Sequence, residues 1–104
     1  MLTTDSPPSA IFATTDWMAI GALEASREMG LSVPQDLSVL GLDDTVIGAH
    51  ISPPLTSIAI PKDQLAQAAT EMLLQQINGI SDYQSPVLIS PTLRLRHSTA
   101  APLH

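Results

Sequence analysis

Short apolar runs alternate with a helical stretch along the first part of the chain, and this alternation most constrains the fold. The runs lie at 10–14, 37–42 and 56–60, and the second (L-S-V-L-G-L) is apolar enough to be covered on both faces. Residues 16–29 have apolar side chains at helical spacing and precede Gly30, which suits a left-handed helix cap. The order predicts an open α/β sheet of parallel strands with flanking helices. The apolar face expected of the first helix consists of Met18, Ala22, Ala25 and Met29.

The second half of the chain is expected to add a helix and two strands. Residues 62–78 carry a single apolar stripe, which indicates a helix. Residues 87–89 form an apolar run typical of a strand, and residues 92–96 alternate strictly, so that Arg94 and Arg96 share one face. An ion pair or a solvated face explains these two cations better than a nucleic-acid patch does.

Composition argues against several classes of function. The formal net charge is −6 with only 4 lysines and arginines, so direct binding to nucleic-acid phosphates is disfavoured. There is no long apolar run for a membrane span, and cysteine is absent, which excludes disulfides and thiolate metal sites. Residues 1–9 lack the pattern of an export signal, so we expect a cytoplasmic protein. No metal-ligand spacing or nucleophile–base arrangement occurs, so we expect no cofactor, metal or catalytic residue.

Polar residues follow two of the expected strands, where open α/β sheets bind their ligands. Thr15 and Trp17 follow the first strand, and Asp43 and Asp44 follow the second. If those strands are parallel neighbours, both clusters emerge at one edge of the sheet. Carboxylates accept hydrogen bonds from hydroxyls and repel phosphates, and the indole of Trp17 offers an apolar face to a ring. A neutral polyol therefore fits this edge better than a nucleotide.

Each of these residues also has an ordinary structural explanation. Asp16 is better explained as the N-cap of the first helix, and Thr15 as a residue at the helix entry. Asp43 has a turn role as its alternative, and Asp44 is expected to bond nearby backbone N–H groups. For Trp17, packing and ligand stacking are about equally supported.

Four segments carry motifs that occur in order along most of the chain. Residues 10–23 match AIFA-x-N-D-x-MA-x-GAL, with Thr15 in place of the asparagine. Residues 30–44 match GL-x-VP-x-DVSV-x-G-[FY]-DD, with Leu37 in place of the second valine and Leu42 in place of the aromatic residue. Residues 52–58 resemble SPPLTT[IV], with a serine in place of the second threonine, and residues 93–99 match L-x-x-R-x-ST. Taken together, these motifs resemble those of the LacI/GalR family of bacterial repressors.

The resemblance implies part of an effector-sensing domain shaped like the type I periplasmic sugar-binding proteins, as an incomplete two-lobe domain. The expected segments are a lead-in at 1–9, a sensor portion at 10–97 and a frayed tail at 98–104. Within the sensor portion, the resemblance assigns residues 10–60 and 91–97 to the C-terminal lobe and residues 61–90 to elements of the N-terminal lobe.

The resemblance also implies roles for individual residues. Asp43 matches an aspartate that bonds effector hydroxyls or a base edge, and Thr15 takes the place of the effector-facing asparagine. Leu65 matches a position near the cleft on the other lobe, and Ile20 and Ile51 match positions at the subunit interface. The implied partners are a small sugar or nucleoside-like effector, a second copy in a homodimer, and DNA only through a helix-turn-helix that these residues lack.

The leading hypothesis is therefore the effector-sensing and dimerisation portion of a transcriptional regulator. One alternative is a fragment of a periplasmic sugar-binding transport protein, which shares the fold but carries an export signal. The other is a small α/β enzyme whose turnover depends on Asp43.

Overall fold

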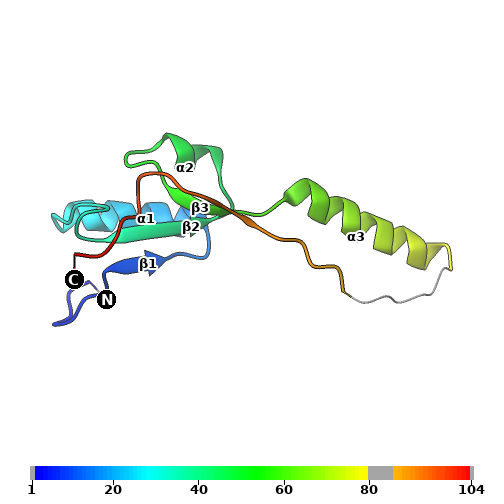
Figure 1. Cartoon of the computed structure of the whole chain (residues 1–104), viewed down its shortest axis with the longest axis horizontal. Coiled ribbons are helices and arrows are strands. Elements are labelled where there is room, and N and C mark those ends of the chain that lie inside the picture. The colour runs from blue at the N-terminus through cyan, green and yellow to red at the C-terminus, as the bar shows by residue number, and fades with distance from the viewer. Residues whose placement is uncertain (1, 80–85, 104) are drawn as a thin grey trace. The chain divides into compact units, whose positions relative to one another are not determined.

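The computed structural model describes residues 2–79 and 86–103, and they divide into two units. The first unit contains residues 2–59 and 93–103, and the second contains the described residues between 60 and 92. Figure 1 shows the elements of each unit in chain order. The assignment of the two units to lobes of a larger domain stays a prediction.

The first unit is built on a sheet whose first three strands are parallel neighbours, which confirms the expected fold class. In the described part of the chain, the sheet has the order β1-β2-β3-β4, formed by β1 (Ala10–Phe12), β2 (Ser38–Leu42), β3 (Thr56–Ala59) and β4 (Thr92–Arg94). In the central strand, Leu40 pairs with Phe12 on one side and with Thr56 on the other, both in parallel. Parallel neighbours must be joined by crossover connections, and the segments between these strands supply them.

Helix α1 (Asp16–Glu28) connects β1 to β2 and packs against β2. Its buried face centres on Ala19 and Ser26, both fully buried, whereas Met18 is 62% exposed and Met29 43%. Of the apolar face expected from the sequence, Ala22 is partly buried and packs against the core, as predicted. The prediction is wrong for Met18, Ala25 and Met29, which are exposed, because small side chains let the helix approach the sheet closely. The helix ends just before Gly30, which has the left-handed backbone expected of it, with φ 75°. Beyond Gly30, Leu31 N–H donates to Ser26 O at 2.9 Å.

The apolar core of the first unit is small and lies between α1 and the sheet. Its buried side chains are Ala13, Ala19, Leu37, Val39 and Leu55. Buried polar residues accompany them, and no buried side-chain nitrogen or oxygen among the described residues lacks a hydrogen-bond partner. This polar satisfaction is what allows hydroxyl-bearing residues to occupy interior positions of the sheet.

Two further helices follow the second strand. The five-residue helix α2 (Val46–His50) begins after Thr45, whose hydroxyl accepts from Gly48 N–H at 3.3 Å. Helix α3 (Lys62–Ile77) confirms the helix expected at 62–78, although none of its residues is buried. Apolar side chains such as Leu73 and Ile77 on α3 are more than half exposed.

The strand expected at 87–89 is absent. These residues are described by the structure but belong to no strand, and Leu88 is 93% exposed. A short apolar run becomes a strand only when a neighbouring strand takes up its backbone hydrogen bonds, and none of the described strand pairs includes this segment.

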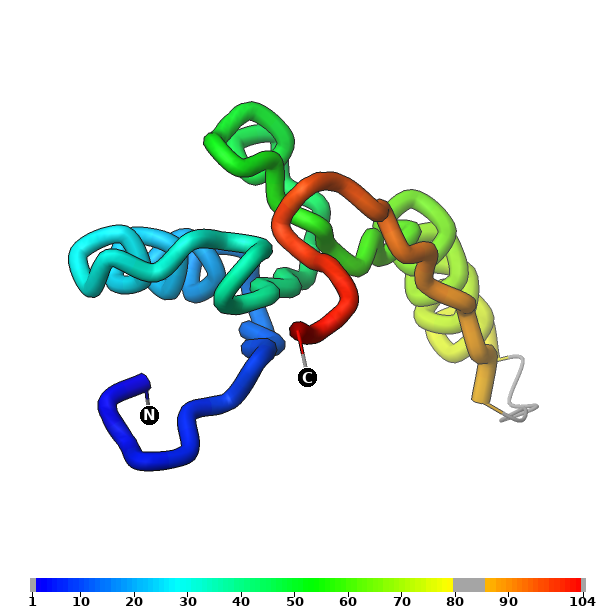
Figure 2. The backbone as a smooth tube through the Cα atoms, turned by 60° about the vertical axis from the view of Figure 1, so that its left-hand side comes forward, coloured from blue at the N-terminus to red at the C-terminus, as the bar shows by residue number. Residues whose placement is uncertain are grey.

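The expectation that the chain frays from Ser98 onward is wrong for the first residues of that segment. Ser98 is fully buried, and its hydroxyl donates to Val39 O at 2.5 Å and accepts from Thr56 N–H at 2.8 Å. Ala100 N–H donates to the Ser38 hydroxyl at 3.0 Å. The C-terminal segment, red in Figure 2, is thereby held against β2 and β3.

We expect α3 to exchange its amide hydrogens much faster than β2. A 16-residue helix with no buried residue gains little tertiary stabilisation, and isolated helices of about this length are marginal in water. Hydrogen exchange followed by mass spectrometry of the chain checks this. Comparable protection of the two elements would contradict it.

Candidate functional site

The polar clusters that follow β1 and β2 emerge at one edge of the sheet. Thr15 and Asp43 each lie three residues beyond the paired residues Phe12 and Leu40 of the parallel strands. Ala13 N–H continues the ladder by donating to Leu40 O at 2.8 Å. Because β1 and β2 run in the same direction, the two clusters leave the sheet together, as the sequence analysis expects.

The N-cap of α1 is Thr15 and not Asp16, which corrects the expectation for Asp16. The Thr15 hydroxyl accepts from Met18 N–H at 3.1 Å, and Thr15 has the extended backbone usual for a cap. Asp16 is the first residue within the helix and is completely buried. The hydroxyl one residue earlier already satisfies the first-turn N–H group, so the carboxylate is turned inward.

The buried carboxylate of Asp16 joins three separate elements. Its Oδ2 accepts from both the backbone N–H and the hydroxyl of Thr45, each at 2.7 Å, and its Oδ1 accepts from the Ser57 hydroxyl at 2.7 Å. These donors, together with the positive end of the α1 dipole, offset the cost of burying a charge. The carboxylate therefore ties the start of α1 to the turn after β2 and to β3.

The turn after β2 has two successive residues in the left-handed region. Asp43 has φ 114° and Asp44 has φ 53°, and neither is glycine, so the backbone of this turn is strained. Its amides are held from β3: Asp43 N–H donates to Ile58 O, and Asp44 N–H donates to the Ser57 hydroxyl, each at 2.9 Å. Such strain persists only where the surroundings fix the backbone, as they do here.

Asp44 forms ion pairs and does not serve the backbone role expected of it. Its carboxylate binds the Arg96 guanidinium, which also donates to Leu55 O at 2.7 Å, and lies 3.7 Å from Arg94 Nε. An ion pair, one of the two explanations considered for the arginines, is therefore confirmed. The pairing connects the turn to β4 and the residues that follow it, and it offsets part of the negative charge at this edge.

The remaining predicted site residues lie in different environments. Trp17 lies on the first turn of α1, two residues after Thr15, and is 66% exposed. Ile20 and Ile51 are half-buried in the first unit, and Ile51 packs against the core. Leu65 lies on α3 in the second unit and is exposed. Their roles in ligand binding and dimerisation stay predictions.

Sequence reasoning missed Ser57 as a member of this site. Ser57 is fully buried in β3 and bridges Asp16 to the amide of Asp44. The one sequence signal for this role was the presence of a serine within an expected strand. A serine hydroxyl that is buried in a sheet needs a hydrogen-bond partner.

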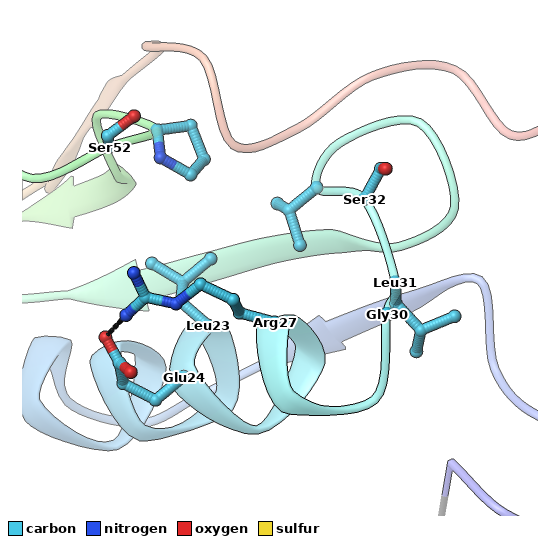
Figure 3. Close-up of a pocket in the computed structure, with 9 residues that line it drawn as sticks. Leu23, Glu24, Arg27, Gly30, Leu31, Ser32 and Ser52 are labelled. Carbon is cyan, nitrogen blue, oxygen red and sulfur yellow. Dashed lines mark hydrogen bonds and ion pairs between the residues drawn. The ribbon is translucent and has the colours of Figure 1, made fainter.

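A separate groove of about 360 Å³ lies at the other end of α1. Figure 3 shows Arg27 and Glu24 paired on its wall, near Leu23 and the loop that contains Ser32. None of the predicted ligand-binding residues lines it.

Within 2–79 and 86–103, no three histidine or acidic side chains gather closely enough to hold a metal ion. Among the helices of those same residues, none has both the length and the apolar content to cross a membrane.

A family model described as a periplasmic binding protein-like domain matches residues 1–99. The chain belongs to this family. The ribose operon repressor of Haemophilus influenzae is 41% identical over 98 residues, which are 94% of this chain and 30% of that repressor. This periplasmic binding protein-like chain thus spans about a third of the length of that curated relative.

Solved structures agree with this assignment. A LacI family transcriptional regulator from Enterococcus faecium with bound ribose is 33% identical, with a TM-score of 0.80 over 96% of this chain and 37% of that one. The lac repressor dimer bound to operator and the anti-inducer ONPF is 37% identical, with a TM-score of 0.82 over 90% of this chain and 32% of that one. The likeness to a LacI/GalR sensor domain is confirmed, and the relatives named here are transcriptional regulators.

We expect Gly41→Ala to destabilise the first unit, by about 1–3 kcal/mol, because its new methyl group overpacks the site. A Cβ at this position would lie 2.3 Å from Asp16 Oδ1 and 2.9 Å from Leu55 Cδ2. Gly21→Ala is the matched control, since nothing lies within 4 Å of its Cβ in the exposed face of α1. The control should stabilise by about 0.5–1 kcal/mol. Urea denaturation measures both changes, and equal effects would contradict the packing.

Arg96→Ala should cost more stability than Arg94→Ala. Arg96 has a 21% exposed side chain with two acceptors, whereas that of Arg94 is 58% exposed with one distant partner. We expect losses of about 1.5–3 kcal/mol for Arg96 and below about 1 kcal/mol for Arg94. Urea midpoints of the two variants measure the difference, and a larger loss for Arg94→Ala is the contrary outcome.

Proposed function

We propose that the chain is the effector-sensing and dimerisation part of a cytoplasmic LacI/GalR-type transcriptional regulator. Its ligand is a small neutral sugar or nucleoside-like molecule that contacts Asp43, Thr15 and Trp17 at the shared edge of β1 and β2. The observation that carries this proposal is the strained turn that holds Asp43 at the carboxyl ends of the strands.

The chemistry of this edge favours an uncharged ligand with hydroxyl groups. The neighbouring carboxylates are engaged inside the protein, Asp16 with Thr45 and Ser57 and Asp44 with arginine. The carboxylate of Asp43 can accept hydrogen bonds from ligand hydroxyls but repels phosphate. The exposed indole of Trp17 adds an apolar surface against which a sugar ring or a base can stack.

Thr15 supplies a hydrogen-bond donor at the same edge of the sheet as Asp43. Its hydroxyl oxygen accepts from Met18 N–H, and a hydroxyl that accepts in this way keeps its own hydrogen to donate. A donor and an acceptor at one edge of the sheet match the two roles of a ligand hydroxyl. The bound ribose in the relative from Enterococcus faecium supports a sugar as the first ligand to test.

The proposal includes a homodimer and an indirect link to DNA. In this proposal Ile20 and Ile51 line the interface with a second copy, and Leu65 keeps the ligand-contact role that the family resemblance implies. Contact with DNA belongs to a helix-turn-helix outside these residues, in keeping with the net charge of −6. In this arrangement the effector acts by favouring one of two conformations of the regulator.

Ligand binding can be tested in a chimera in which this chain replaces the matched 98 residues of the Haemophilus influenzae ribose operon repressor. Isothermal titration with D-ribose and with inosine should detect binding of one of them. Asp43→Asn should raise the Kd at least about tenfold, because a charge-assisted acceptor of ligand hydroxyls is lost.

The matched control is Asp5→Asn, which makes the same change at an exposed aspartate in the lead-in. It should leave the Kd unchanged. Binding with the same affinity in Asp43→Asn would defeat the assignment of this residue, and an unaltered chimera that binds neither probe would count against the proposed ligand class.

A further inference from the structure

The amides of the strained turn depend on a residue that does not face the ligand edge. Three successive N–H groups, those of Asp43, Asp44 and Thr45, donate to Ile58 O, to the Ser57 hydroxyl and to Asp16 Oδ2. The last two acceptors both involve Asp16, directly or through the Ser57 hydroxyl. Loss of this carboxylate would therefore remove the support of two of the three amides.

The Ser57 hydroxyl is oriented by Asp16. It donates its hydrogen to Asp16 Oδ1 at 2.7 Å, which leaves its oxygen lone pairs directed to other donors. One of these accepts Asp44 N–H at 2.9 Å. Without the carboxylate, the hydroxyl could rotate and the geometry at Asp44 would no longer be fixed.

Close packing holds the Asp16 carboxylate in place. A Cβ on Gly41 would lie 2.3 Å from Oδ1, and a Cβ on Gly48 would lie 3.0 Å from Oδ2. Both oxygens are therefore in contact with bare backbone, and Asp16 is completely buried. This fit leaves no room for a longer acid such as glutamate.

We propose that Asp16 is a positioning residue of the effector site, acting through the turn of Asp43, Asp44 and Thr45. It follows Thr15 directly on α1 and bonds to the turn after β2, so it sets the spacing between the two polar clusters that receive the ligand. This inference rests on the proposed function, because it assigns Asp16 a role in the same site.

The test compares two buried serines in the full chain. Ser57→Ala removes the hydroxyl that links Asp16 to Asp44, whereas Ser26→Ala removes an equally buried hydroxyl that donates only to Ala22 O of its own helix. Asp16→Asn is the third variant, since it keeps the size of the side chain and removes one of its acceptors.

Amide hydrogen exchange measured by NMR gives the first readout. In Ser57→Ala and Asp16→Asn, we expect the amides of Asp44 and Thr45 to exchange about tenfold faster relative to the Val39 amide of the same variant. In Ser26→Ala the ratios should stay at their original values. A purely structural role of Asp16 would change all of these amides in parallel, and that result would overturn the proposal.

Affinity in the repressor chimera gives the second readout. For the probe that the chimera binds, D-ribose or inosine, Ser57→Ala should raise the Kd about tenfold and Ser26→Ala should not. Equal affinities in the two serine variants would overturn the positioning role. Failure of the parent chimera to bind either probe would overturn the proposed function alone, because the exchange ratios still decide whether Asp16 holds the turn.

Discussion

The buried carboxylate of Asp16 is the interaction on which the edge of the sheet depends. Its two oxygens accept from Thr45 twice and from Ser57 once, and these partners come from two elements that follow β2. A buried charge is tolerated only when its hydrogen bonds are satisfied, so the turn, β3 and the start of α1 must adopt one mutual arrangement. That arrangement holds the strained backbone of Asp43 and Asp44 through the amides of the turn.

Polar contacts also determine the path of the C-terminal segment. Hydroxyls of Ser38, Thr56 and Ser98 connect this segment to β2 and β3, where an ordinary sheet interior would rely on apolar contacts. Hydrogen bonds require defined distances and angles, whereas apolar contacts tolerate sliding. The small apolar core provides burial, and the hydroxyls specify which residues lie opposite one another.

These two sets of contacts meet at the candidate ligand edge. Asp44 lies between them, because its amide bonds to Ser57 in the Asp16 network and its carboxylate pairs with Arg96. Arg96 N–H in turn donates to the Thr56 hydroxyl at 2.9 Å. A ligand that contacts Asp43 would therefore act on a residue whose neighbour is already fixed to the C-terminal segment.

Local sequence patterns determined most of the secondary structure and the class of the fold. The alternation of apolar runs and helical stretches is enough to predict the parallel sheet, and Gly30 is enough to predict where α1 ends, because both depend on neighbouring residues and backbone sterics. The placement of Thr15 and Asp43 at one edge follows from the parallel direction of their strands.

Only the tertiary structure decided the role of Asp16, the partner of Asp44 and the buried face of α1. It also decided that residues 87–89 do not form a strand. The partners of Asp16 lie 29 and 41 residues away, and that of Asp44 lies 52 residues away. Such contacts depend on how the elements pack, and a pattern of neighbouring residues does not encode that packing. For the same reason, an apolar run without a pairing strand in the described chain remained outside the sheet.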